Sequence, residues 1–376
     1  MYIVQKQLEN LKKLIQPGKV VVIYGARRTG KTTLINEFLK GASGENLLVS
    51  GEDITVSSYL SSQSIEKLAA FVGQATLLII DEAQKIPNIG INLKLIVDHI
   101  PGVRVVVSGS SSFDLARSTG EPLTGRKYTL RLYPLAQMEI CQIEKIHQTD
   151  ANLEGRLIYG SYPEVVLMRD NTGRQKYLQE IVSSYLYKDI VELDGIRHSG
   201  KIIRLLQLLA FQIGKEVSYS ELGGALSMSK NTVERYLELL EKAFVLQKLS
   251  GFSRNLRNEI KKNSRYYFLD NGVRNALINN FNPLEQRNDA GELWENYLVL
   301  ERMKKQEYLN VAANNYFWRT HTQQEIDFVE EREGRLFAYE IKWRKTKSSP
   351  PALWRKTYPD SSFASVHREN YLDFIT

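Results

Sequence analysis

Cysteine and long apolar runs are what this sequence has least of. Cys141 is the only cysteine in 376 residues, so the chain offers neither a disulfide framework nor a cluster of thiolate ligands. No stretch stays apolar over the roughly 20 residues that a membrane-spanning helix needs. The first residues scatter charges through an amphipathic pattern and lack the apolar core of a signal peptide. We therefore expect a soluble, cytoplasmic protein with no membrane partner.

Length and charge set the frame for what the chain can be. Its 376 residues are enough for about two to four domains with cores of their own. The formal net charge is +7 and the isoelectric point is about 9.1. Such a balance favours an anionic partner without identifying one.

A glycine-rich motif follows the first apolar strand of the sequence. Residues 20–24 are apolar and lead into Gly25-x-x-x-x-Gly30-Lys31-Thr32. A strand, a glycine turn and a helix start direct backbone N–H groups to one point, where the helix terminus adds partial positive charge. Lys31 can reach the phosphates, and the Thr32 hydroxyl is placed for Mg²⁺. The motif predicts a P-loop that binds a nucleoside triphosphate.

The residues expected to contact the nucleotide extend along this loop. They are Gly25, Arg27, Arg28, Thr29, Gly30, Lys31, Thr32 and Thr33. For Arg27 and Arg28 two interpretations stay open, because these side chains can counter phosphate charge or can face solvent or a neighbouring subunit.

A second strand supplies acids for the same site. Residues 77–82 read LLIIDE, which is the composition of a strand buried on both faces of a parallel sheet. Asp81 would hold Mg²⁺ together with Thr32, and Glu82 would orient the attacking water as a general base. The other interpretation is a strand that ends in a solvated acidic turn. Beside a P-loop, the spacing favours ATP hydrolysis with Mg²⁺.

Three more β-rich runs, 46–50, 103–108 and 128–132, complete a predicted five-stranded sheet. Strands alternate with helical segments, which indicates an open parallel α/β sheet with its ligand at the carboxyl ends of the strands. Ser110 follows the fourth strand, where a polar side chain could sense the γ-phosphate. A serine-rich turn explains Ser110 equally well.

These motifs resemble a family. The P-loop, the IIDEAQ segment, VVVSGSSS, the stretch from Leu123 to Glu139 and Gly160-Ser-Tyr-Pro-Glu164 are similar to bacterial and archaeal AAA-type ATPases that carry a carboxy-terminal domain of uncharacterised function. The resemblance implies an ATPase domain over residues 1–148. It also implies an arginine from a neighbouring copy in a homo-oligomer. Arg126 resembles that residue by position and Arg117 is the alternative, although either arginine could simply lie at the surface.

The middle of the chain changes character. Residues 149–198 are helical in period and predict a small helical lid, whose stripe of Tyr177, Leu178, Ile181, Tyr185 and Leu186 favours core packing. Residues 199–275 predict three helices and two strands, the pattern of a winged helix-turn-helix. Five basic residues against one acid between Arg254 and Arg265 favour contact with DNA phosphates, but winged helices also serve as packing modules.

A second constellation lies in residues 285–376. A helix acid, Glu295 with Glu292 as the alternative, precedes Asp327 on one strand and Glu340-x-Lys342 on the next. Glu340 and Lys342 share a face because strand side chains alternate with a period of two. The arrangement resembles the PD-(D/E)xK nuclease fold, which implies Mg²⁺ on the carboxylates and a lysine beside the attacking water. A structural acid–lysine pair is the other interpretation.

Two functions follow from the sequence. The first is an ATP-hydrolysing AAA-type ATPase that acts on or with DNA. The alternative is a nucleotide-dependent switch or scaffold whose carboxy-terminal half binds a protein partner, without nuclease activity.

Overall fold

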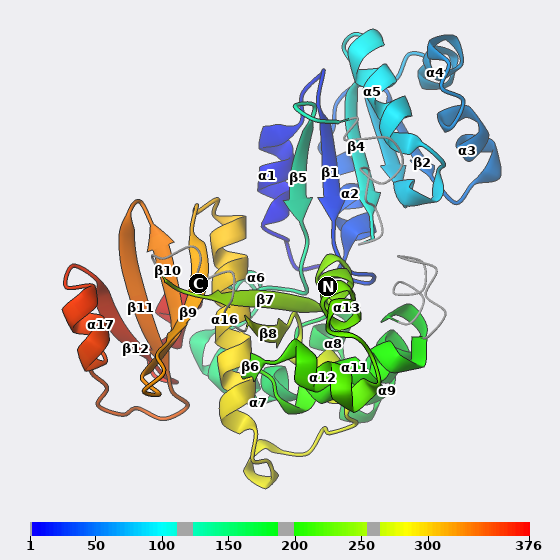
Figure 1. Cartoon of the computed structure of the whole chain (residues 1–376). Coiled ribbons are helices and arrows are strands. Elements are labelled where there is room, and N and C mark those ends of the chain that lie inside the picture. The colour runs from blue at the N-terminus through cyan, green and yellow to red at the C-terminus, as the bar shows by residue number, and fades with distance from the viewer. Residues whose placement is uncertain (1, 111–122, 187–198, 254–263) are drawn as a thin grey trace. The chain divides into compact units, whose positions relative to one another are not determined.

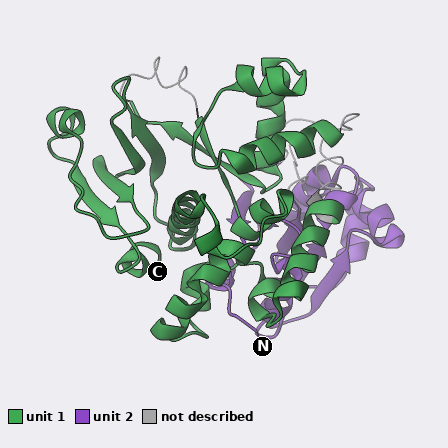
Figure 2. Cartoon of the chain, turned by 90° about the horizontal axis from the view of Figure 1, so that it is seen from below, with its two compact units in different colours: residues 1, 135–376 green, residues 2–134 purple. Residues whose placement is uncertain are grey.

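The chain is divided into two compact units (Figure 2). The computed structural model describes residues 2–110, 123–186, 199–253 and 264–376. Residues 2–134 form the first unit, which we call the amino-terminal unit, and residues 135–376 belong to the second, the carboxy-terminal unit. The four-part division expected from the sequence is finer than this and stays a prediction.

The amino-terminal unit is built on a five-stranded parallel sheet (Figure 1). The strands lie in the order β2-β3-β4-β1-β5. Their bounds are β1 Val20–Tyr24, β2 Asn46–Ser50, β3 Leu77–Asp81, β4 Arg104–Gly109 and β5 Lys127–Arg131. The predicted parallel α/β sheet is confirmed, and each of the five predicted strands lies within one residue of its expected place.

Helices cover both faces of this sheet. Their bounds are α1 Gln7–Leu14, α2 Lys31–Leu39, α3 Ile54–Leu60, α4 Ile65–Val72, η1 Ala83–Lys85 and α5 Ile89–His99. On β1, Val21 and Ile23 pack with side chains of α1 and α2, whereas Val20 and Val22 pack with side chains of α4 and α5. This alternation explains why β1 is apolar throughout, since a strand covered on both faces has no wet side.

The carboxy-terminal unit contains a seven-stranded mixed sheet in the order β12-β11-β10-β9-β7-β8-β6. The bounds are β6 Glu216–Val217, β7 Leu246–Gly251, β8 Ser264–Phe268, β9 Asn314–Arg319, β10 Glu325–Arg332, β11 Arg335–Ile341 and β12 Ser362–Val366. β10 and β11 form a hairpin, with Phe328 opposite Tyr339. Glu333 and Gly334, both at positive φ, make its two-residue turn, as the twist of a hairpin favours.

One pairing in this sheet joins two segments that the sequence suggests are separate. β7 lies parallel to β9, with Ser250 opposite Tyr316 and Gly251 opposite Phe317. The strands expected in the winged helix and those expected in the last domain therefore share a single sheet. The short β6 and the terminal strand β12 were not predicted, because neither carries a clear β-rich pattern.

Helices make up the rest of this unit. They are α6 Gln137–Ile140, α7 Ile146–Tyr159, α8 Pro163–Leu167, α9 Asn171–Glu180, η2 Ile181–Leu186, α11 Ser199–Phe211, α12 Tyr219–Leu226, α13 Lys230–Lys242, α15 Asn271–Leu277, η3 Leu284–Gln286, α16 Ala290–Tyr308, α17 Ala352–Thr357 and α18 Tyr371–Ile375. Leu178 and Ile181 of the expected stripe are buried, while the side chains of Tyr185 and Leu186 lie outside the described part. In the ranges that the structure describes, no helix has the length and apolar character to cross a membrane.

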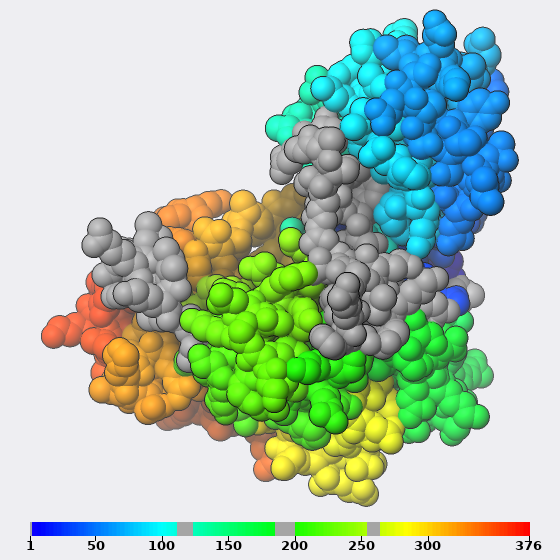
Figure 3. Space-filling view, turned by 45° about the vertical axis from the view of Figure 1, so that its right-hand side comes forward, coloured from blue at the N-terminus to red at the C-terminus, as the bar shows by residue number. Residues whose placement is uncertain are grey.

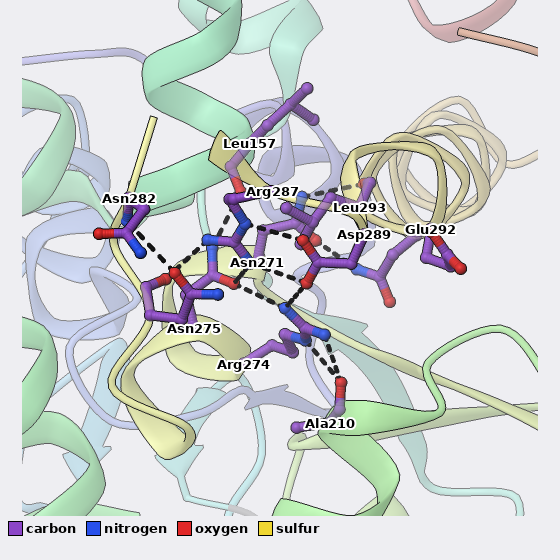
Figure 4. Close-up of polar contacts among 12 residues, drawn as sticks. Leu157, Ala210, Asn271, Arg274, Asn275, Asn282, Arg287, Asp289, Glu292 and Leu293 are labelled. Atoms are coloured by element: carbon purple, nitrogen blue, oxygen red, sulfur yellow. Dashed lines mark hydrogen bonds and ion pairs between the residues drawn. The ribbon is translucent and has the colours of Figure 1, made fainter. Parts of the chain in front are cut away.

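A buried polar network ties four of these helices together (Figure 4). Arg274 on α15 donates through Nε to the carbonyl of Ala210 on α11 at 2.8 Å and pairs with Asp289 at 2.5 Å. Arg287 joins the same carboxylate at 2.8 Å and also donates to Asn275 at 2.9 Å. Because Asp289 directly precedes α16 and Asn275 donates to carbonyls of α7, the network fixes α7, α11, α15 and α16 relative to one another.

Candidate functional site

The P-loop lies between β1 and α2, at the carboxyl edge of the parallel sheet. Gly30 precedes α2 with φ 98°, a conformation that only glycine adopts without strain. At Gly25, a Cβ atom would lie 2.2 Å from the carbonyl oxygen of Leu132. Both glycines of the motif are therefore required by the backbone itself, as a turn that approaches its neighbours closely demands.

Lys31 places a positive charge inside this loop. Its residue is only 5% exposed, and Nζ donates to the carbonyls of Gly25 at 2.8 Å and Ala26 at 3.0 Å. The ammonium group is held at the first turn of α2, where the helix terminus also carries partial positive charge. An anion entering the loop would find both.

Asp81 and Thr32 meet at the end of β3. The Thr32 hydroxyl donates to Asp81 Oδ2 at 2.7 Å. Ser108 on β4 donates to the other carboxylate oxygen and accepts the backbone N–H of Glu82 at 3.2 Å. Three elements far apart in sequence thus converge on one carboxylate, and its known partners among the described side chains are neutral hydroxyl groups.

Glu82 is held in an unusual conformation next to Asp81. Its φ is 53°, a left-handed value that costs a residue with a side chain about 1 kcal/mol or more. Gln84 donates to Glu82 Oε2 at 2.6 Å and to the Ser110 hydroxyl at 3.2 Å. The neighbouring Gly51 leaves room for this turn, since a Cβ there would lie 2.4 Å from the Glu82 carbonyl oxygen. Glu82 and Ser110 are therefore linked through one glutamine.

The other predicted nucleotide contacts differ in exposure. Thr29 is fully buried and donates its hydroxyl to the Ala26 carbonyl at 2.8 Å, so it braces the loop from within. Arg28 and Thr33 are exposed, and Arg27 is half-buried. Their roles in nucleotide binding stay predictions.

Arg126 lies at the opposite edge of the sheet from the P-loop. It directly precedes β5, whose first residue pairs with Val20, the first residue of β1. Its Nε lies 2.7 Å from Asp98 Oδ1, and the hydrogen bond from Arg126 lowers the pKa of Asp98. Arg126 cannot reach the P-loop of its own chain from there, so a catalytic role requires a second copy. Arg117, the alternative, lies outside the described residues.

Two contributors to this site were not identified from the sequence. Gln5, which is 3% exposed, donates from Nε2 to the Thr29 carbonyl at 2.9 Å. Ser108 holds Asp81 and Glu82 together as described above. Neither has a local signal, because Gln5 contacts a loop 24 positions away and Ser108 looks like the end of an ordinary buried strand.

The predicted carboxylates of the second constellation gather between α16 and the seven-stranded sheet. We call Glu295, Glu325, Asp327 and Glu340 the carboxylate cluster. Lys342 lies 2.7 Å from Glu340, and the backbone N–H of Ile341 donates to Asp327 Oδ2 at 2.8 Å. Glu292, the alternative helix acid, lies instead 3.8 Å from Lys215.

The guanidinium group of Arg265 on β8 lies within this cluster. Its side chain is 5% exposed, and its nitrogens lie 3.0 Å from Glu325, 3.4 Å from Glu295 and 4.0 Å from Asp327. It also stacks on the Phe317 ring, with its central carbon 4.6 Å from the ring centroid. A cation supplied by the chain therefore occupies the space between the carboxylates.

Burial perturbs the titration of this cluster. It raises the pKa of Glu295 from 4.5 to about 8, with the Asp327 charge acting in the same direction. Burial and the Glu340 charge raise the pKa of Asp327 from 3.8 to about 6. Burial opposes protonation of Lys342, but the hydrogen bond to Glu340 and the Asp327 charge outweigh it and raise the pKa of Lys342. The buried surroundings screen the repulsion between the negative charges of these acids poorly.

The two sites differ in how well they fit a divalent metal. At the P-loop, a hydroxyl and a carboxylate oxygen at 2.7 Å are the hard oxygen ligands that Mg²⁺ takes beside phosphates. In the carboxylate cluster, Arg265 and the Ile341 N–H use the oxygens that a metal would need. Within the part of the chain that the structure describes, no three His, Cys, Asp or Glu side chains are arranged to hold an ion. The residues as they stand do not fit the metal of a nuclease.

Three family models match successive parts of the chain. Residues 17–141 match the model of the AAA domain. Residues 150–284 match one domain of unknown function (DUF8612) and residues 290–359 match another (DUF4143). The match to the AAA domain spans the sheet and the P-loop described above.

The curated relatives are uncharacterised proteins. One from Mycobacterium tuberculosis is 28% identical over 345 residues, which cover 90% of this chain and 73% of that protein. One from Haemophilus influenzae is 24% identical, with 90% and 86% covered, and one from Methanocaldococcus jannaschii is 25% identical, with 84% and 73% covered.

Two solved structures are also similar, at low TM-scores. A signal transduction ATPase with numerous domains and a tetratricopeptide repeat sensor, from Pyrococcus horikoshii, has a TM-score of 0.31 at 14% identity, covering 81% of this chain and 46% of that one. A RuvB mutant from Thermotoga maritima has a TM-score of 0.34 at 18% identity, covering 65% and 90%. Scores this low decide nothing about the fold, and the assignment rests on the AAA-domain match, the parallel sheet and the P-loop. The amino-terminal unit thus carries the P-loop and the parallel sheet in a region that matches the AAA domain.

Proposed function

We propose that the amino-terminal unit binds and hydrolyses ATP at the P-loop. The contact that supports this best is the 2.7 Å hydrogen bond from Thr32 to Asp81. It joins the phosphate-binding loop to the acid of a separate strand, which is the pair of groups that a nucleotide-bound Mg²⁺ requires. Mg²⁺ would neutralise charge on the triphosphate, and Thr32 and Asp81 would hold it.

The side chains at this site have separable tasks. Lys31, now bonded to two loop carbonyls, would turn its ammonium group to phosphate oxygens. Glu82 would accept a proton from the attacking water, and Gln84 orients its carboxylate through the 2.6 Å hydrogen bond. Ser108 on β4 holds both Asp81 and Glu82 at the end of β3.

Release of phosphate from ATP is the direct test. Purified full-length protein with Mg²⁺ is expected to turn over ATP, and a Glu82→Gln variant is expected to bind ATP without turning it over. GTP in a parallel assay measures the base preference. Absence of ATP binding by the wild-type protein, measured by calorimetry, would contradict the assignment.

We further propose that residues 199–275 contact DNA as a winged helix-turn-helix. The order α11, β6, α12, α13, β7, β8, with β8 between β6 and β7, supports this proposal, because three helices precede the two predicted strands. The Ser229 hydroxyl caps α13 by accepting the Thr232 N–H at 3.1 Å. In the space-filling view the green segment that holds α12 and α13 forms part of the surface (Figure 3). The residues at the start of α13, Ser229 to Asn231, are exposed.

Charge on α13 is mixed, because the exposed Lys230 at its start favours DNA whereas Glu234 and the exposed Glu238 on the same helix would oppose it. Lys230 and Asn231 at its start are exposed. Glu241 is turned toward β7, where it accepts the Lys248 N–H at 3.2 Å, so it does not oppose DNA at that end. The basic residues between Arg254 and Lys262 that were expected on the wing lie outside the described residues.

Binding of labelled duplex DNA at increasing salt tests the DNA contact. A Lys230→Glu variant is expected to bind more weakly and with a shallower salt dependence, because phosphate contacts release counterions. Lys242→Glu, the same charge change at the other end of α13, is the matched control and should bind as wild type. If DNA neither binds nor stimulates ATP hydrolysis, the switch or scaffold with a protein partner becomes the better hypothesis.

A further inference from the structure

We propose that the carboxylate cluster is a latent divalent-cation site that Arg265 closes, so that the chain as it stands holds no metal there. The proposal concerns the carboxy-terminal unit alone and does not depend on ATP hydrolysis. Its basis is the position of one buried guanidinium group among carboxylates that come from three different elements.

The geometry shows why Arg265 acts as the cation of this site. Glu295 comes from α16, while Glu325 and Asp327 come from β10, and one guanidinium group lies 3.0 to 4.0 Å from all three. Its strand, β8, reaches the cluster because β7 joins β8 to β9 in the same sheet. The Phe317 ring lies under the guanidinium plane, which favours a flat cation at this point.

Arg265 does not neutralise the whole cluster. Glu340 is paired with Lys342 at 2.7 Å, and Glu325 also lies 3.7 Å from Arg319, so Arg265 is the guanidinium partner of the buried Glu295 and Asp327. The Tyr267 hydroxyl donates to Glu295 at 2.7 Å. The second partner of Glu295 is therefore a neutral group and not a cation.

A metal and Arg265 exclude each other. Two cations within a few ångströms repel strongly in a poorly screened interior, and the oxygens that would coordinate the ion are already engaged. Asp327 illustrates this, because Oδ1 faces Arg265 while Oδ2 accepts the Ile341 N–H. Removal of the guanidinium group would free Asp327 Oδ1 and leave the buried acids without their cation, a strongly destabilising state.

The experiment is rescue of stability by Mn²⁺ in the full-length protein without nucleotide. All four tryptophans of the sequence, at 294, 318, 343 and 354, lie in the carboxy-terminal unit, so their fluorescence reports its melting. Arg265→Ala is expected to melt at a lower temperature than wild type. Mn²⁺ should then raise the melting temperature of this variant by at least about 3 °C, and the added change Asp327→Asn should abolish the rescue. The wild type should not respond.

Two further variants control the interpretation. Arg302 is another buried arginine of the same unit, but it faces the single carboxylate of Glu330 at 2.5 Å. Arg302→Ala should therefore be destabilised without rescue by Mn²⁺. Arg265→Lys keeps a cation in place and should remain unresponsive to the ion.

Either of two results would overturn the proposal. One is an Arg265→Ala protein that folds and shows no Asp327-dependent response to Mn²⁺. The other is binding of Mn²⁺ to the wild type that is lost in Asp327→Asn, measured by titration calorimetry of both proteins. Any binding of Mn²⁺ at the P-loop is the same in the two proteins and does not affect the difference. This second measurement decides the question even if Arg265→Ala does not fold, because a closed site predicts no difference between the two proteins.

Discussion

Both candidate sites in this chain place acids where Mg²⁺ was expected, yet they are built in opposite ways. At the P-loop, Asp81 is held by the hydroxyls of Thr32 and Ser108, which are neutral groups that can share it with an ion. In the carboxylate cluster, the acids surround the buried cation of Arg265. The comparison shows that acidic residues at a suitable spacing do not define a metal site. What decides is whether the chain already supplies the cation.

The largest effect is expected for Lys31→Ala. Lys31 carries the only lysine charge of the P-loop motif, and its loss removes the main attraction for the β and γ phosphates. We expect ATP turnover to fall by at least about a hundredfold, measured by phosphate release. Full activity in this variant would show that ATP turnover does not depend on the P-loop lysine. The P-loop could then no longer be preferred over the carboxylate cluster as the site that takes a metal ion.

Lys40→Ala is the matched control for that change. Lys40 lies at the end of the same helix and pairs with Glu37 at 2.6 Å on the surface. Lys40→Ala removes one positive charge, as Lys31→Ala does, but at the far end of α2 and away from the P-loop. Its turnover should equal that of wild type.

Glu82→Gln separates chemistry from binding. The amide keeps the size of the side chain but cannot accept a proton, so kcat should fall by about 10²- to 10⁴-fold while ATP still binds. Glu52→Gln, on the exposed turn after β2, is a control that should leave kcat unchanged. If both variants lost ATP binding equally, the effect would be structural.

The titration of Glu295 should distinguish the carboxylate cluster from the P-loop site. A carboxyl group whose pKa is raised on folding favours the folded state at low pH, and this contribution is lost as the pH rises through the raised value. For Glu295 the window runs from 4.5 to about 8, and Asp327 adds to it between 3.8 and about 6. The unit should therefore lose stability between pH 5 and 8, by an amount on the order of 3–5 kcal/mol.

Glu295→Gln provides the check on this window. Urea unfolding followed by tryptophan fluorescence should show a midpoint that falls with pH in the wild type and changes much less in the variant. An equal dependence in both proteins would show that Glu295 titrates normally and that the cluster is less tightly enclosed than its contacts indicate.

The sequence was sufficient for the amino-terminal unit because its signals are local. Each of its main features can be recognised from a few neighbouring residues: the strand at 20–24, the glycines at 25 and 30, and the acids at 81 and 82. The carboxyl ends of parallel strands lie at the same edge of the sheet. The strand order β2-β3-β4-β1-β5 was not part of the prediction. Gln5 and Ser108 were missed because their roles exist only after the chain has folded.

The carboxylate cluster shows where sequence reasoning stops. Glu295, Asp327, Glu340 and Lys342 were predicted for this site, and they do lie near one another. Glu325 was not predicted as a member. Arg265 was counted only as one of several basic residues on a wing. Nothing near position 265 indicates that β7 pairs with β9 and so brings a guanidinium group to acids up to 62 positions away. A contact of that range depends on sheet topology, which no local pattern encodes.

The smallest expected effect concerns Gln5, which fixes the geometry of the P-loop without contributing charge. Its amide donates to the Thr29 carbonyl at 2.9 Å, and in a trans peptide the next N–H, that of Gly30, points the opposite way. Gln5 thus directs one N–H group away from itself and into the loop. Gln5→Ala frees this peptide, so KM for ATP should rise by about tenfold while kcat changes little, because a buried hydrogen bond contributes about 1–2 kcal/mol. Gln16→Ala, whose partner is the exposed Tyr128 hydroxyl at 3.1 Å, should have no effect. An equal loss of kcat in Gln5→Ala would show that the amide acts on the reacting groups, and the P-loop site would then depend on a positioning contact in the same way that the carboxylate cluster depends on Arg265.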